Sequence, residues 1–431
     1  MRKLILVELN EINFDIVSKY SKKIKFKFFT ENFLNNLKTT SSEKEYSKLE
    51  PWIQWVSAHT GKSASEHKVF RLGDIGQYNE KQIFEIVEDL GFDVGAICPM
   101  NTKNSMKNPK YFFSDPWTQN EKLGENKKLE YAISSLVNNN SNNKNSIINY
   151  FIFIFYSIKI MRFNVFIRAI GLFFLSFYKK WKRALILDLF LHELHLKFIK
   201  KFKPDFSTVF FNSGAHIQHH YFFLSKEINK KKLKLPKKYR NIKYDPILDM
   251  YLFYDKILSD YSSLNYNVVI ATGLSQIPYD RVKYYYRPID HKTFLYKLNI
   301  KPCEIYPRMS RDFLIEFESE KDALNCEETL KLINYKNKFD VFYFENRGKT
   351  IFITFKYDDR IDNNSFIFNS EGKKIFLDKM VSFVAIKNGM HSEKGYLSLP
   401  SELAKYMPKN NHVKNIFQLI YNYFSNIYAK N

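Results

Sequence analysis

Cysteine is scarce in this chain of 431 residues. The three cysteines are Cys98, Cys303 and Cys326, and none of them belongs to a Cys-x-x-Cys pair. A disulfide framework uses an even and closely spaced set, so this odd and scattered set excludes one. We therefore expect reduced thiols and a cytoplasmic protein.

We expect neither a targeting segment nor a membrane-spanning segment. The first residues are basic, but their apolar run breaks at Glu8 and no small-residue cleavage site follows, so they predict a β-strand rather than a signal peptide. Residues 145–158 are uncharged and strongly apolar. This stretch of fourteen residues falls short of the roughly 20 needed to cross a bilayer.

Signatures of nucleic-acid binding are missing as well. The sequence has no zinc-finger spacing, no aromatic RNA-binding motif and no arginine-rich stripe, so we expect no nucleic-acid partner. Lys and Arg number 67 against 45 for Asp and Glu, a net charge of +22. Compositional drift explains part of this excess, but the field still favours anionic partners such as a phosphorylated metabolite or a lipid headgroup surface.

Strand and helix patterns alternate along most of the chain. Residues 4–9, 94–98, 208–211 and 268–271 have the pattern of buried strands, whereas residues 14–20, 80–90, 185–202 and 246–261 have helical spacing. This alternation predicts an α/β fold with a mostly parallel central sheet and helices on both faces. The length predicts one large domain with insertions, or two domains.

We expect five parts along the chain. They are a first part of the core at 1–117, a basic and apolar helical insertion at 118–184, a second core part at 185–300, a small β-α-β-β subdomain at 301–360, and a last core part with a C-terminal helix at 361–431. In the subdomain a hairpin is expected across residues 346–348. In the last part, residues 381–386 are expected as a strand of the main sheet, followed by a turn that carries His391.

The insertion permits two interpretations. Residues 145–183 combine apolar bulk with Lys and Arg, which is typical of an element lying in the headgroup region of an anionic membrane. Alternatively, they form a helical cap on the core whose lysines face solvent.

Histidines gather after the strand at residues 208–211. A Ser-Gly turn follows Asn212 and begins a short helix on which His216, His219 and His220 are related as i, i+3 and i+4. Such residues share one helix face, and imidazole is the commonest metal ligand among side chains. The pattern favours a metal site at the carboxyl edge of the sheet, although three histidines can also meet in a polar turn by chance.

The order of these motifs resembles that of a known family. Residues 9–15, residues 55–61 followed by Glu66-His67, the pair Asn212-x-x-x-His216, and His391-x-x-x-Gly395 occur in the order of motifs in the alkaline phosphatase superfamily. The resemblance is strongest to its type I phosphodiesterase/nucleotide pyrophosphatase branch, and spans residues 1–100 and 185–400. It implies an alkaline phosphatase-like fold and phosphoryl transfer assisted by metal ions.

Several positions depart from the pattern of that family. Asn10 stands for the first-strand Asp, Pro51 beside Glu50 stands for the nucleophile, and Thr272-Gly273-Leu274-Ser275 replaces Ser-Asp-His-Gly. The resemblance therefore implies at most one divalent ion, Zn, Mn or Mg. Its expected ligands are Asn212, His216 and His391, with His219 and His220 as further candidates.

Three functional interpretations follow. In the first, the chain is an enzyme with one metal ion or none, in which Asn10 contributes to the site and Glu8, Glu11 or Glu50 acts as base. In the second, it is an inactive relative that binds a phosphorylated ligand or a protein. In the third, Ser57 or Thr60 is a nucleophile. The polar groups kept at the replaced positions favour the enzyme, a phosphodiester hydrolase or transferase.

The substrate class follows from the resemblance and the charge. We expect a phosphorylated or nucleotide-activated small molecule, or a lipid-linked glycan. Relatives in surface polysaccharide synthesis imply a cytoplasmic protein at the inner face of a membrane.

Overall fold

The computed structural model describes residues 3–29, 33–118, 126–142, 147–228, 233–236, 239, 243–307, 311–335, 338 and 340–429. Two compact units are present. The first comprises residues up to 137, 146–279 and from 388 onward, and the second comprises residues 280–387 with the end of α5.

A seven-stranded sheet forms the centre of the first unit. Its strand order is β2-β15-β6-β1-β5-β3-β4, and the strands β6, β1, β5, β3 and β4 run parallel. β15 and β2 complete one edge in antiparallel pairing. The bounds are β1 Lys3–Leu9, β2 Leu37–Ser41, β3 Val94–Ile97, β4 Tyr111–Phe113, β5 Phe206–Phe211, β6 Tyr266–Ala271 and β15 Lys394–Ser398. The expected mostly parallel α/β sheet is confirmed.

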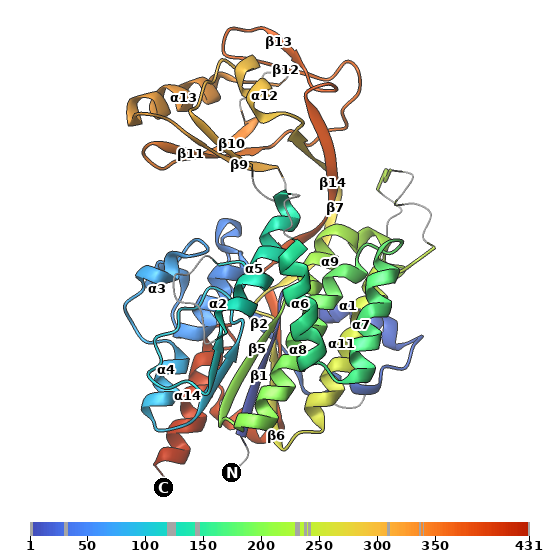
Figure 1. Cartoon of the computed structure of the whole chain (residues 1–431), viewed down its shortest axis with the longest axis vertical. Coiled ribbons are helices and arrows are strands. Elements are labelled where there is room, and N and C mark those ends of the chain that lie inside the picture. Colours follow the sequence, from blue (N-terminus) through green and yellow to red (C-terminus); the bar gives the residue numbers. More distant parts are fainter. Residues whose placement is uncertain are drawn as a thin grey trace. The chain divides into compact units, whose positions relative to one another are not determined.

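Helices cover both faces of this sheet (Figure 1). Alternate residues of a strand point to opposite faces, and β1 accordingly sends Ile5 and Val7 into one apolar cluster and Leu4 and Leu6 into the other. The helices of the first cluster include α1 Phe14–Ser21, α8 Lys182–Phe202, α9 Ser213–Tyr221 and α11 Pro246–Ser262. Those of the second are α2 Pro51–Thr60, α4 Ile83–Asp89 and α14 Asn415–Tyr428. Burial on both faces explains the continuous apolar runs of the central strands.

The insertion consists of helices. α5 Lys127–Asn142 precedes α6 Ile147–Ile160 and α7 Phe163–Ser176, and the latter two pack against α8 and each other. Among the described residues, no helix combines the length and the apolar character needed to span a bilayer.

The second unit contains a four-stranded antiparallel sheet of order β10-β11-β9-β8. Its hairpin joins β10 and β11 across Arg347-Gly348, as the sequence predicted. The bounds are β8 Glu304–Pro307, β9 Asp312–Glu316, β10 Phe342–Asn346, β11 Thr350–Phe355, β12 Phe366–Phe368, β13 Lys374–Phe376, α12 His291–Lys297 and α13 Glu320–Leu332.

One strand differs from its predicted pairing. β14, Val381–Ser392, pairs with β7, Ser275–Pro288, rather than with the main sheet, and β15 is the segment that returns to that sheet. His391 therefore lies inside a strand and not in the turn after it. An alternating pattern predicts a strand but does not name its partner, so sequence could not decide between these pairings.

The remaining short elements are α3 Ala64–His67 and the 3-10 helices η2 Leu34–Asn36, η3 Tyr46–Lys48, η4 Asp74–Gln77, η5 Phe222–Leu224 and η6 Ser401–Tyr406.

Candidate metal centre

The candidate site lies at the carboxyl edge of the parallel strands. β1 ends at Leu9 and is followed by Asn10 and Glu11, and its neighbour β5 is followed by Asn212 and α9. Neighbouring parallel strands end at the same edge, which is where open α/β sheets bind ligands.

Glu11 has an unusual backbone conformation that aims its side chain. Its φ of 60° lies in the left-handed region, which costs a residue with a side chain about 1 kcal/mol. Its amide donates to the Thr272 carbonyl at 3.2 Å, and its own carbonyl accepts from the Gln218 side chain at 2.7 Å and from the Gln276 amide at 3.0 Å. These bonds hold the strained turn, a feature that clusters at functional sites.

Three donor atoms converge on one point. Glu11 Oε2 lies 3.0 Å from His219 Nε2 and 3.1 Å from His391 Nε2, and the two Nε2 atoms are 3.4 Å apart. A tetrahedral zinc ion with ligands at its usual bond lengths places neighbouring donors about 3.3 Å apart. The observed triangle therefore fits one such ion.

The electrostatics of Glu11 follow from its two imidazole neighbours. Burial alone raises a carboxyl pKa, but His391 and His219 lower the pKa of Glu11 well below its ordinary value. The Gln276 side chain also donates to Glu11 Oε2. Glu11 is thus held as a carboxylate with an oxygen aimed at both imidazoles.

Glu50 approaches the opposite nitrogen of His391. Its Oε2 lies 3.6 Å from His391 Nδ1, an ion-pair contact longer than a hydrogen bond. Glu50 precedes α2, yet its side chain makes no capping hydrogen bond there. A carboxylate behind a ligating imidazole is the usual arrangement for orienting a metal ligand.

Asn10 and Asn212 form a direct amide pair. Asn10 Nδ2 donates to Asn212 Oδ1 at 2.8 Å and to Glu11 Oε1 at 3.2 Å, and its Oδ1 accepts from Trp55 Nε1 at 2.9 Å. The buried amide of Asn10 is therefore satisfied within the protein.

His216 and His220 lie together on α9. Their ring centroids are 4.6 Å apart, and His216 is exposed whereas His220 is half-buried. Of the histidines expected from the sequence, the structure thus places His219 and His391 at the Glu11 triangle and pairs His216 with His220.

Glu8 lies within the protein interior. It is fully buried, with Oε1 accepting from Thr208 Oγ1 at 2.7 Å and 3.0 Å from His59 Nε2. Ser57 and Thr60 are buried as well; Ser57 Oγ contacts His67 Nε2 at 3.1 Å, and Thr60 donates to the Val56 carbonyl at 2.7 Å. Neither hydroxyl is presented to solvent as a nucleophile would be.

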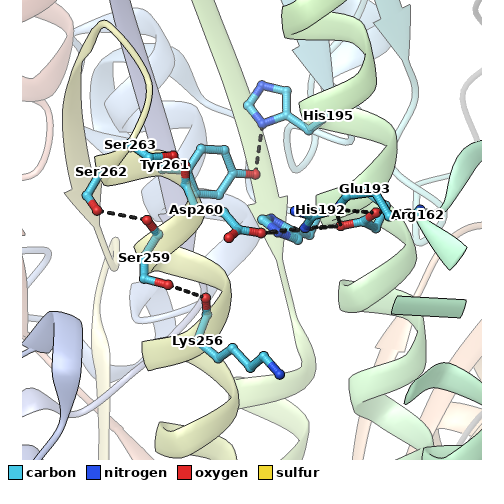
Figure 2. Close-up of polar contacts among 10 residues, drawn as sticks. All are labelled: Arg162, His192, Glu193, His195, Lys256, Ser259, Asp260, Tyr261, Ser262 and Ser263. Atoms are coloured by element: carbon cyan, nitrogen blue, oxygen red, sulfur yellow. Dashed lines mark hydrogen bonds and ion pairs between the residues drawn. The ribbon is translucent and has the colours of Figure 1, made fainter. Parts of the chain in front are cut away.

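A second cluster of metal-ligand type is filled by an arginine (Figure 2). His192 Nε2 lies 3.1 Å from Asp260 Oδ2, and Glu193 is adjacent. Arg162 Nη2 lies 2.5 Å from Glu193 Oε1 and contacts Asp260 Oδ2, so the guanidinium neutralises both carboxylates. This cluster is an ion-pair network between α8 and α11.

Some residues at the site were missed by sequence reasoning. Glu11 was considered as a base and not as a ligand, and Gln218 and Gln276 were not considered at all. Asp188 was also missed: it accepts from the amides of Asn212 at 3.2 Å and Ser213 at 3.0 Å, and burial raises its pKa to about 6. An acidic residue two positions after a strand end was the available signal for Glu11.

Comparisons with known proteins place this geometry beside solved structures. No family model and no curated protein matches the chain. The structure is similar to phosphonoacetate hydrolase from Sinorhizobium meliloti 1021, solved with phosphonoformate, over 97% of this chain and 95% of that chain, at 10% sequence identity and a TM-score of 0.44. It is also similar to murine ectonucleotide pyrophosphatase/phosphodiesterase 5 over 98% and 95% of the two chains, at 10% identity and a TM-score of 0.42.

At this level of similarity the matches say which structures the chain resembles, and the chemistry of the site is derived below from its own residues.

Proposed function

We propose that this chain is an enzyme with one metal ion that hydrolyses or transfers the phosphoester group of a small phosphorylated substrate. The observation that carries the proposal is the triangle of Glu11, His219 and His391 at the carboxyl edge of the parallel sheet. Nucleotide-activated sugars and lipid-linked glycans of surface polysaccharide synthesis are the substrates expected from the resemblance.

Two imidazoles and one carboxylate form the proposed ligand set. This set is found in catalytic zinc sites, whereas Mg²⁺ prefers oxygen ligands and water, so the donors favour zinc. When bound, such an ion polarises a phosphoryl oxygen and lowers the pKa of water. The polypeptide supplies Glu11 as a preformed carboxylate and fixes His219 on α9.

The amide pair supports one ion rather than two. In the family that the sequence resembles, the positions of Asn10 and Asn212 carry carboxylates, and these two carboxylates bind two different metal ions. Here the two side chains hydrogen-bond directly at 2.8 Å, and neither carries a charge that a second ion would neutralise. We assign Asn10 as a positioning residue that orients Glu11 and Asn212.

Glu50 is the proposed base. Its side chain is 31% exposed, so it meets both solvent and the metal ligand His391. Pro51 offers no hydroxyl, and therefore the proposed reaction is direct attack of water on phosphorus, with its proton passing to Glu50 and the phosphoester bond breaking toward the leaving oxygen. Glu8 is buried with His59 and is assigned to holding that interior network.

Metal analysis combined with hydrolysis tests this proposal. Purified protein is expected to bind about one zinc ion per chain and to hydrolyse bis(p-nitrophenyl) phosphate or p-nitrophenyl phosphate when loaded. His219→Ala and His391→Ala should lose both metal and activity, whereas His216→Ala should keep the metal. If His216→Ala lost the metal and His219→Ala kept it, the metal would instead be bound by the motif pair Asn212-x-x-x-His216. Metal binding without turnover of any phosphoester would indicate a binding protein.

A further inference from the structure

Two helices of the insertion expose an extensive apolar surface. α6 turns Phe151 outward with 67% of its surface exposed, and α7 does the same with Phe163 at 80% and Tyr178, just beyond its end, at 86%. The outward apolar residues, here called the α6–α7 face, are Ile147, Ile148, Phe151, Ile154, Phe155, Ile158, Phe163, Ile167, Ile170, Phe173, Phe174, Leu175, Phe177 and Tyr178.

α6 is apolar on both its inner and its outer side, unlike a helix that faces water. Its inner side packs Phe153, Tyr156 and Ile160 against the core, and Asn149 and Ser157 on that side find partners in the Ser135 hydroxyl and the Phe153 carbonyl. Its outward side carries Ile and Phe at i, i+4, i+7 and i+8 spacing. Apolar patches of this extent on a protein surface mark an interaction site.

The charge of the segment identifies the kind of partner. Residues 147–187 contain no Asp or Glu. Of their cations, Arg162 pairs with Glu193 and Asp260 and Lys182 pairs with Asp249, and the others include Lys159, Arg168, Lys179 and Lys180. A symmetric contact between two copies would place these cations against one another with no carboxylate of the segment to pair them. A partner with an anionic surface and an apolar interior would match both the cations and the exposed apolar side chains.

Helix length excludes a spanning arrangement for these two elements. α6 and α7 each have 14 residues, against about 20 needed to cross the hydrocarbon core. An apolar helix face bordered by Lys and Arg lies in the plane of a membrane, with its apolar side chains below the headgroups. We propose that the α6–α7 face docks on an anionic lipid surface, an inference that does not depend on the proposed chemistry of the metal centre.

Vesicle co-sedimentation of the full chain tests the proposal. We expect recovery with vesicles of phosphatidylcholine mixed with phosphatidylglycerol, weaker recovery with phosphatidylcholine alone, and loss of the difference at high salt. Lys159→Gln/Lys180→Gln should weaken the partition coefficient about fivefold for each charge removed. Phe151→Gln/Phe155→Gln/Phe163→Gln should abolish binding while leaving thermal stability unchanged, since all three side chains are exposed.

Matched controls lie in the second unit. Lys321→Gln/Lys349→Gln removes the same charge, and Leu324→Gln/Leu332→Gln removes exposed apolar residues, with Leu324 56% exposed; both should bind vesicles like the wild type. Equal recovery with both lipids, insensitive to salt and to the variants of α6 and α7, would overturn the proposal. A stable dimer in light scattering that the triple Phe variant dissociates would also overturn it, by assigning the face to a second copy.

Discussion

The carboxylate of Glu11 and the imidazole of His391 lie 3.1 Å apart, although one follows the first strand of the chain and the other lies near the end of β14. His219 closes the triangle from α9. This relationship makes the ligand set testable residue by residue.

Replacing Glu11 tests the carboxylate ligand. Glu11→Gln keeps the shape of the side chain but removes the charge, so zinc affinity should fall more than in any variant of a residue behind the ligands. Zinc should raise the melting temperature of the wild type, because a ligand that binds the folded state stabilises it, and should not raise that of the variant. Differential scanning calorimetry with and without zinc measures both, and an equal zinc shift in the two proteins would refute the assignment.

Replacing Glu50 tests whether it orients the proposed metal ligand His391. Glu50→Gln should weaken zinc binding about 10- to 100-fold, as loss of a carboxylate behind a ligating imidazole does elsewhere. Competition with a zinc indicator gives the affinity. Glu45→Gln is the control, because Glu45 is exposed and pairs with Lys48 instead. An unchanged zinc affinity in Glu50→Gln would show that Glu50 does not orient His391.

Replacing Gly389 tests whether the Gln276 side chain holds Glu11 in position. A Cβ at this position would overlap Gln276 Oε1 and approach the Gln218 carbonyl at 3.2 Å. Gly389→Ala should therefore displace the Gln276 side chain, which donates to Glu11, and lower zinc affinity about tenfold. Gly372→Ala is not a suitable control because its φ is positive, whereas Gly76→Ala meets open space. Wild-type affinity in Gly389→Ala would show that Gln276 is dispensable.

Arg162 should matter for stability rather than for metal binding. Arg162→Gln leaves Glu193, which is 2% exposed, beside Asp260 without a cation, and we expect a loss of about 2 kcal/mol in the free energy of unfolding. The estimate is below the range for fully buried pairs because the guanidinium is 44% exposed. Urea denaturation measures it, with the exposed Lys180→Gln as control. A change within 0.5 kcal/mol would mean that the network is solvated.

The same network predicts a pH dependence. Burial raises the pKa of Asp260, but hydrogen bonds from His192 and Arg162 lower it to about 2 from an ordinary 3.8. A lowered carboxyl pKa adds stability above pH 3.8, and this stability is lost as the pH falls toward 2. Since the side chain is 34% exposed, the loss should be about 1 kcal/mol relative to Asp260→Asn. Parallel acid unfolding curves for the two proteins would contradict this.

The sequence alone predicted the α/β architecture and the sheet edge at which the candidate site lies. Alternation of buried strands with amphipathic helices requires a parallel sheet, and parallel strands deliver the residues after their ends, Asn10 and Asn212, to one edge. The length and charge of residues 145–183 also limited the insertion to a cap or an interfacial element.

Tertiary structure decided which side chains meet. His216, His219 and His220 share a helix face, so their spacing could not tell which one approaches Glu11. The packing of α9 against α8 and α11 brings His219 there and pairs the other two. The side chain of Glu11 points at the two imidazoles because its backbone adopts a left-handed conformation, which long-range hydrogen bonds stabilise. The outward direction of the α6 apolar residues was likewise undecided, since an apolar helix can bury either side and only packing on α8 left Phe151 exposed.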